Sequence, residues 1–306
     1  MNPSGKSASW NAKLPAMFNS KSIALTCLLF FTFLFNGFCQ ESKSLLWKIS
    51  GNGITQPSYL FGTIHLICEN DFIVSPAVET SVKNASQVYL EIDMDDPNLN
   101  AQMQQYMKMA NGQKLQNVLK PDDYKVVSRF FKDSLGVNVD FFNDTKPMLL
   151  YSFVLIKMMN GCNIKSYEQA FVEMAKKQQK EVKGLETVAQ QMSFIDQISA
   201  EKQGDDLVKA IKNYPVYRTY FTKLINVYKE QDIEGLQKLF SDPEFGTSEN
   251  ENETLIYNRN KTWIEQIKAI ALKQPTFFAV GAGHLAGDSG VIKLLRNQGF
   301  KVEPVN

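Results

Sequence analysis

The sequence contains only two histidines, and both stand in the same local pattern. His65 ends the segment Gly62-Thr63-Ile64-His65, and His284 ends the segment Gly281-Ala282-Gly283-His284. An apolar, β-type run precedes each glycine, so each histidine should follow the end of a strand. An imidazole can act as a general base near neutral pH or coordinate a metal ion. We therefore expect the two histidines to share one active site.

The position of these histidines supports that expectation. In α/β sheets the carboxyl ends of the strands open onto the crevice where ligands bind. The glycine of each motif would permit a positive φ or a close approach of backbone or ligand. The alternative is that two unrelated histidines cap core strands without taking part in any reaction.

An open catalytic metal site uses about three protein ligands and leaves one position for water. Two histidines therefore require a carboxylate. Glu91 is the leading candidate, because the apolar strand around it should carry it to the functional edge of the sheet. Asp93 is on the same face by period-two alternation and is the substitute.

Two further segments carry groups that could act at such a site. Glu186 follows a strand-like segment and opens a helix, where a preference for negative charge at helix N-termini would also explain it. Arg259 and Asn260, on the helix before the second motif, could clamp an anionic group, or Arg259 could pair with an acid on the surface.

The elements that must position these residues are indicated by hydrophobic periodicity. In the first third, strands are expected over 45–49, 58–64 and 87–92, and a helix over 76–84. Between 98 and 230 the spacing is helical, with one strand signal at 181–184, and the expected helices cover 98–110, 121–133, 146–159, 166–179, 186–198 and 201–229.

The last part of the chain returns to alternating elements. We expect an acidic surface loop over 241–253, then helix 254–273, strand 276–280, helix 287–298 and strand 301–305. The fold class is therefore α/β, with a central mixed sheet formed by the N- and C-terminal segments and a helical middle insertion. The domain should cover 45–306, with its helical lobe at about 98–230.

Residues 1–39 are typical of an export signal. They carry three lysines and no acid, and an apolar run over 23–38 follows the lysines. Cleavage would release the protein to the periplasm or the medium without a membrane span; the alternative is an uncleaved anchor. Cys68 and Cys162 would remain in the mature protein, and could form a disulfide or simply be buried.

The net charge of +1, with both signs scattered, argues against nucleic acid as a partner. A peptide or a small molecule is the expected substrate class. The sequence does not indicate the oligomeric state.

The sequence resembles the TraB/GumN family, which includes the TIKI proteins and is related to erythromycin-esterase-like and ChaN-like folds. The resemblance covers about residues 45 to 306, and its blocks include SYLFGTIHL, VYLEIDM, KEVKGLET, YNRNKTW and FFAVGAGHL. It implies a metal-dependent hydrolase, possibly a peptidase, in which His65, His284 and Glu91 hold a divalent ion such as Mn, Co or Zn. A metal-free esterase-like hydrolase, a protein that binds haem or a small ligand without turnover, and a structural interaction domain are the alternatives.

Overall fold

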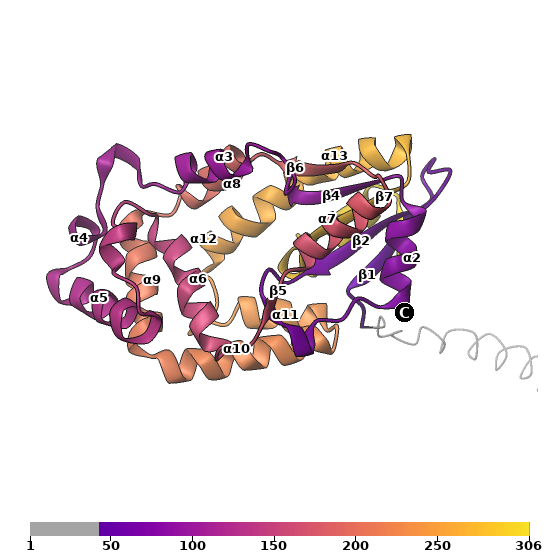
Figure 1. Cartoon of the computed structure of the whole chain (residues 1–306). Coiled ribbons are helices and arrows are strands. Elements are labelled where there is room, and N and C mark those ends of the chain that lie inside the picture. Colours follow the sequence, from indigo (N-terminus) through magenta and orange to yellow (C-terminus); the bar gives the residue numbers. More distant parts are fainter. Residues whose placement is uncertain (1–42, 306) are drawn as a thin grey trace, which may run out of the picture. The chain divides into compact units, whose positions relative to one another are not determined.

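Strands from both ends of the chain alternate in one six-stranded mixed sheet, as expected from the sequence. The computed structural model describes residues 43–305, so the predicted export signal lies outside the described residues. The strand order is β6-β4-β7-β2-β1-β8 (Figure 1). These strands are β1 (Leu46–Ser50), β2 (Ser58–Thr63), β4 (Gln87–Ile92), β6 (Val182–Glu186), β7 (Thr276–Gly281) and β8 (Lys301–Pro304).

Four of these strands run parallel, which brings their carboxyl ends to one edge of the sheet. The strand β7 is parallel to both of its neighbours, β2 and β4, and β4 is parallel to β6. The strand β1 pairs antiparallel with β2 and with β8. Parallel strands are covered on both faces and therefore read as continuous apolar runs. Five of the six residues of β7 are buried, in agreement with this rule.

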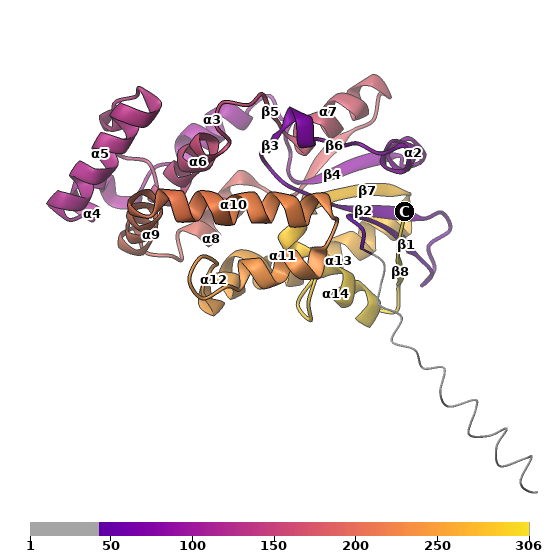
Figure 2. The ribbon, with the colours of Figure 1, turned by 90° about the horizontal axis from the view of Figure 1, so that it is seen from below.

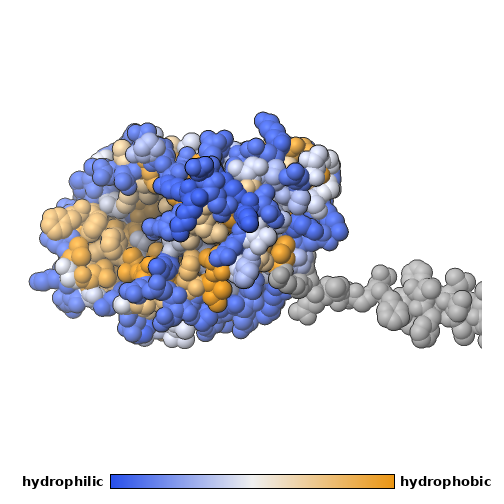
Figure 3. All heavy atoms as spheres, turned by 45° about the vertical axis from the view of Figure 1, so that its right-hand side comes forward, coloured by the Kyte–Doolittle hydropathy of each residue, from blue (hydrophilic) through white to orange (hydrophobic). Residues whose placement is uncertain are grey.

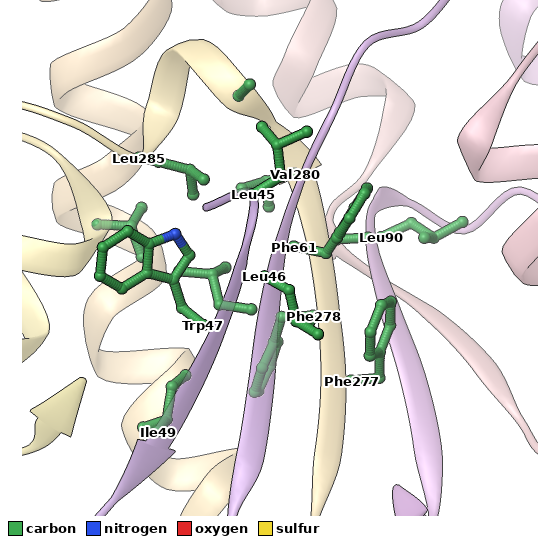
Figure 4. Packing of buried hydrophobic residues seen from close by; sticks show 14 of the residues in the cluster. Leu45, Leu46, Trp47, Ile49, Phe61, Leu90, Phe277, Phe278, Val280 and Leu285 are labelled. Carbon is green, nitrogen blue, oxygen red and sulfur yellow. The ribbon is translucent and has the colours of Figure 1, made fainter. Parts of the chain in front are cut away.

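Helices cover both faces of the sheet. Helices α2 (Pro76–Asn84) and α7 (Tyr167–Lys177) lie on one face, and α13 (Asn258–Lys273) and α14 (Val291–Asn297) lie on the other (Figure 2). The core between these layers is rich in aromatic rings (Figure 4). Phe171 on α7 lies with its ring centroid 4.9 Å from that of Phe277 and 5.4 Å from that of Phe61. Such tilted or edge-on contacts add to the stabilisation from burial alone.

The middle of the chain forms a helical lobe with an apolar cluster of its own, which includes Leu115, Phe131, Val154 and Leu207. Its longer helices, and those that connect it to the sheet, are α3 (Leu99–Tyr106), α4 (Leu115–Val118), α5 (Pro121–Leu135), α6 (Pro147–Met158), α8 (Val188–Ile195), α9 (Ala200–Lys212), α10 (Tyr214–Lys229) and α11 (Ile233–Phe240). Figure 3 shows apolar surface gathered on the left of its view.

Two expectations about helices were wrong. Residues 201–229 form two helices, because Pro215 occupies the first turn of α10 and cannot continue the hydrogen-bond ladder of α9. The acidic stretch 241–253 was expected to be a loop throughout, but only its first part is one. Ser248 and Glu251 form a capping box that starts α12 (Glu249–Asn252). This helix continues through a π-helical turn, η4 (Glu253–Tyr257), into α13.

Several short elements complete the fold. Strands β3 (Ile67–Cys68) and β5 (Ile164–Lys165) form a separate antiparallel pair. Cys68 and Cys162 are joined by a disulfide, which settles the alternative left open by the sequence. The 3-10 turns are η1 (Glu69–Asp71), η2 (Ala110–Gly112), η3 (Val139–Phe142) and η5 (Ala282–His284). Within residues 43–305, no helix is both long and apolar enough to cross a membrane.

Candidate functional site

The two histidine motifs lie side by side on neighbouring parallel strands. Thr63 on β2 is opposite Gly281 on β7, so the motifs are shifted by one residue relative to each other. Neither Gly62 nor Gly281 has a positive φ. A Cβ on Gly62 would lie 2.7 Å from the Leu285 side chain, so this glycine allows the chain after β7 to pack directly onto β2. A Cβ on Gly281 would lie 3.2 Å from Oε1 of Glu91, so the second glycine leaves room for that carboxylate.

His284 is buried and held in one tautomer. The Nδ2 of Asn260 donates to the carbonyl oxygens of His284 and Ser289, at 3.2 and 2.8 Å. The Oδ1 of Asn260 must therefore accept from the Nδ1–H of His284, at 2.6 Å. This leaves Nε2 as an acceptor, and Nη1 of Arg259 donates to it at 3.2 Å. Burial lowers the pKa of His284 to about 3, so the ring is neutral at pH 7.

Glu91 is buried at the end of β4 and accepts three hydrogen bonds. Its Oε1 accepts from the backbone N–H of Gly281 at 2.8 Å, and its Oε2 accepts from Gln191 at 3.0 Å and from Arg259 at 2.5 Å. Burial alone would raise its pKa, but the guanidinium of Arg259, the charge of protonated His65 and the Gly281 N–H hold that pKa well below the usual range. His284 is neutral and adds no charge.

Arg259 connects the two carboxylates of the site. Its Nε lies 3.1 Å from both oxygens of Glu186, and its Nη2 lies 3.0 Å from one of them. Trp263, one turn further along α13, donates its indole N–H to the same carboxylate at 2.9 Å. Arg259 is 7% exposed, so the expectation that it could pair on the surface was wrong. Glu186 ends β6 and directly precedes Thr187, the N-cap of α8.

His65 follows β2 and is oriented by a different carboxylate. Its Nδ1 lies 2.8 Å from Oε1 of Glu168, which also accepts from the Thr63 hydroxyl at 2.7 Å. The hydrogen bond to Glu168 raises the pKa of His65 to about 9, although the His65 side chain is 68% exposed and solvent screens the interaction. Within residues 43–305, no side chain or backbone group hydrogen-bonds to its Nε2. This nitrogen is therefore open to a ligand.

Glu91, Glu186 and His284 thus surround Arg259, with His65 on the next strand. In the part of the chain that the structure describes, no three His, Cys, Asp or Glu side chains lie close enough to hold a metal ion. The Arg259 guanidinium is bonded to Glu91 and His284, so these two side chains could join His65 in holding a metal only if Arg259 moved away from them.

The other candidates have separate roles. Asp93 does not join the cluster; it is partly buried and accepts the backbone N–H of Asp95. Glu168 and Gln191 were not foreseen, and nothing in their local sequence marks them. Trp263 could have been found, since it stands four residues after Arg259 and therefore shares its helix face.

Comparisons with known proteins agree with the site motifs. The chain is 22% identical to Metalloprotease TIKI2 of Danio rerio, 25% to Metalloprotease TIKI1 of Danio rerio and 24% to Metalloprotease TIKI1 of Homo sapiens. Each match covers 86% of this chain and 61 to 63% of the relative. The chain therefore spans about three fifths of the length of these curated relatives. No solved structure matches significantly.

The TraB/PrgY/gumN family profile matches residues 45–304, which is nearly the whole described part of the chain. This match includes both histidine motifs and all six strands of the sheet. The chain belongs to the TraB/PrgY/gumN family.

Proposed function

We propose that the protein is a hydrolase that cleaves peptide bonds at the carboxyl edge of the sheet, with His65 as the general base. The observation that carries the proposal is the matching hydrogen bonding of the two histidines. In each ring Nδ1 is held by a hydrogen-bond acceptor, Glu168 or Asn260, which leaves Nε2 as the nitrogen that can act on another group. The family's curated relatives named metalloproteases make peptides the first substrate class to test.

In this proposal His65 takes a proton from the attacking water. Its Nδ1–H is held by Glu168, so the neutral ring offers Nε2 as the base. The raised pKa of His65 predicts that the reaction accelerates as pH rises towards about 9, because the neutral fraction of the ring increases. The Glu91, Glu186, Arg259 and His284 cluster provides a fixed charge distribution next to this base.

A metal-dependent form of the same site is the second candidate. It is favoured by the names of the relatives and by the charge of the buried cluster. With both carboxylates ionised, Arg259 compensates only one of them, so a cation nearby would be stabilised. His65, Glu91 and His284 would hold the ion, as a Lewis acid for the scissile carbonyl. Arg259 would first have to release Glu91 and His284.

The hydrolase proposal is tested with His65→Ala, since the exposed ring can be removed with little effect on folding. The wild-type and variant proteins are incubated with a mixture of unlabelled peptides, and new termini are identified by mass spectrometry. We expect cleavage by the wild type and at least a 100-fold loss in the variant. Glu173→Gln, at an exposed position on α7, is the control. Equal cleavage by His65→Ala and the wild type would refute the role of His65.

Elemental analysis of protein purified without a histidine tag separates the two candidates. One equivalent of metal in the wild type, lost in both His65→Ala and His284→Ala, selects the metal-dependent form. If the protein contains no metal and its activity resists chelators, the candidate with His65 as the general base is selected. The Cys68–Cys162 disulfide supports export to an oxidising compartment, which fractionation of the producing cells would test.

A further inference from the structure

The geometry around His65 points to Glu168 as its positioning residue. We propose that Glu168 fixes the orientation and tautomer of the His65 ring, and that the Cys68–Cys162 disulfide holds together the two segments that carry this pair. The correct placement of the ring would then require the oxidised protein. The role given to His65 rests on the proposed function, whereas its orientation does not.

Glu168 has few alternatives to this orientation. It is 9% exposed, and each of its oxygens already has a partner. The Oε1 atom accepts from Thr63 and His65, and Oε2 accepts from the hydroxyl of Ser166 at 2.7 Å. Ser166 also caps α7, so Glu168 lies in the first turn, where the helix dipole stabilises a negative charge. These contacts hold the carboxylate in place independently of His65.

The two partners come from distant parts of the chain, and a small structure joins them. His65 lies two residues before β3, and Glu168 lies three residues after β5. These strands have only two residues each, and Ile164 in β5 is 37% exposed. An isolated pair of such short strands is not stable in water. Covalent closure by Cys68–Cys162 is therefore the strongest link between the segments.

The links immediately beside the bridge are polar. The backbone N–H of Glu69 donates to the carbonyl of Asn163 at 2.8 Å, and the Glu69 carboxylate pairs with Lys165 at 3.0 Å on the surface. The turn before Cys162 uses left-handed backbone at Asn160 and Gly161, with φ of 57° and 76°. This turn sends the chain back from α6 towards β3. Buried contacts hold the start of α7 itself, since the Tyr167 ring lies 5.4 Å from that of Phe61 and 4.5 Å from that of Phe72. Loss of the disulfide would therefore free mainly the loop that carries His65.

The test measures the tautomer of His65 directly. The protein has only two histidines, so long-range proton–nitrogen NMR resolves each ring. When its ring is neutral, wild-type His65 should be protonated at Nδ1, because this nitrogen lies 2.8 Å from Oε1 of Glu168. Glu168→Ala should shift His65 towards the Nε2–H form that free imidazole side chains prefer. Glu168→Gln keeps an acceptor and should restore the Nδ1–H form, while Glu173→Ala on the same helix should change nothing.

The disulfide is tested in the same spectrum with Cys68→Ala/Cys162→Ala. We expect the His65 signal to broaden or to show both tautomers, with the His284 signal unchanged. If Glu168→Ala keeps the Nδ1–H form, the positioning role is wrong. If the double cysteine variant keeps the wild-type spectrum of His65, the bridge is not required.

Where a substrate is found, Glu168→Ala should lower kcat by about 10- to 100-fold with little change in KM. Because the tautomer is measured without substrate, an inactive protein with the expected spectrum would refute the proposed function alone.

Discussion

Replacement of Arg259 by methionine tests whether the guanidinium is the charge that holds the site together. The side chain pairs with Glu91 and Glu186, whose side chains are only 10% and 3% exposed. Methionine fills a similar volume but leaves both carboxylates buried without a counter-charge. Loss of one partner from a buried ion pair costs about 3–5 kcal/mol. For a domain of this size we expect Tm to fall by roughly 6 to 15 °C at pH 7.

The pH dependence of this loss has a definite sign. Without Arg259, burial should raise the pKa of both Glu91 and Glu186 above the unfolded values, so the folded variant binds more protons than the unfolded chain. The free energy of unfolding of the variant should then increase as pH falls from 8 towards 5. Its difference from the free energy of unfolding of the wild type should become smaller over the same range. Calorimetry at several pH values measures this, with Arg259→Lys as an intermediate case because one ammonium cannot bridge both carboxylates as well.

Arg218→Met is the matched control for this experiment. Arg218 is exposed on α10, so its replacement should change the free energy of unfolding by less than about 0.5 kcal/mol. An Arg259→Met protein as stable as the wild type at pH 7 would show that the carboxylates do not depend on the guanidinium. A loss that stays constant between pH 5 and 8 would assign the effect to packing and not to charge.

Three further results are expected. Cys68→Ala/Cys162→Ala closes no loop in the unfolded chain and should lose about 2–4 kcal/mol in urea unfolding, whereas an unchanged midpoint would contradict the structural role of the bridge. The pKa of Glu91 is depressed in the folded protein, so its contribution is present above the unfolded pKa of about 4.3 and is lost at lower pH; Glu91→Gln should flatten the acid limb of a stability–pH curve. Trp263→Phe removes the indole donor to Glu186 and should cost about 1–3 kcal/mol in thermal unfolding, and a neutral effect would mean that water replaces this donor.

The strand framework of the site could be predicted from local sequence. The two Gly-x-x-His segments each follow an apolar run, and Glu91 lies near the end of another, so the carboxyl ends of three strands could be identified without a structure. Hydrophobic periodicity follows from the burial pattern of a strand, and every residue of the strand contributes to this pattern. The structure adds that these strands are direct neighbours.

The partners of the side chains could not be predicted in the same way. For Arg259 the sequence left open an anionic clamp or a surface ion pair, and Glu168, which contacts His65 across 103 residues, was not noticed. A single charged residue in a helix has no periodic signal. Its partner is chosen by the packing of α7 and α13 against opposite faces of the sheet, which depends on the whole tertiary structure (Figure 2).

The place of β7 in the sheet has a consequence for the time at which the site can form. β7 lies between β4 and β2, although it is made about 190 residues after the start of β4 and about 220 after the start of β2. During synthesis β2 and β4 are made long before β7, and their apolar edges stay uncovered until β7 is present. Such long-range parallel pairing forms slowly and late. The edge that carries the candidate site therefore closes only when nearly the entire chain is present, and a chain that ends before Thr276 would lack both the joining strand and His284.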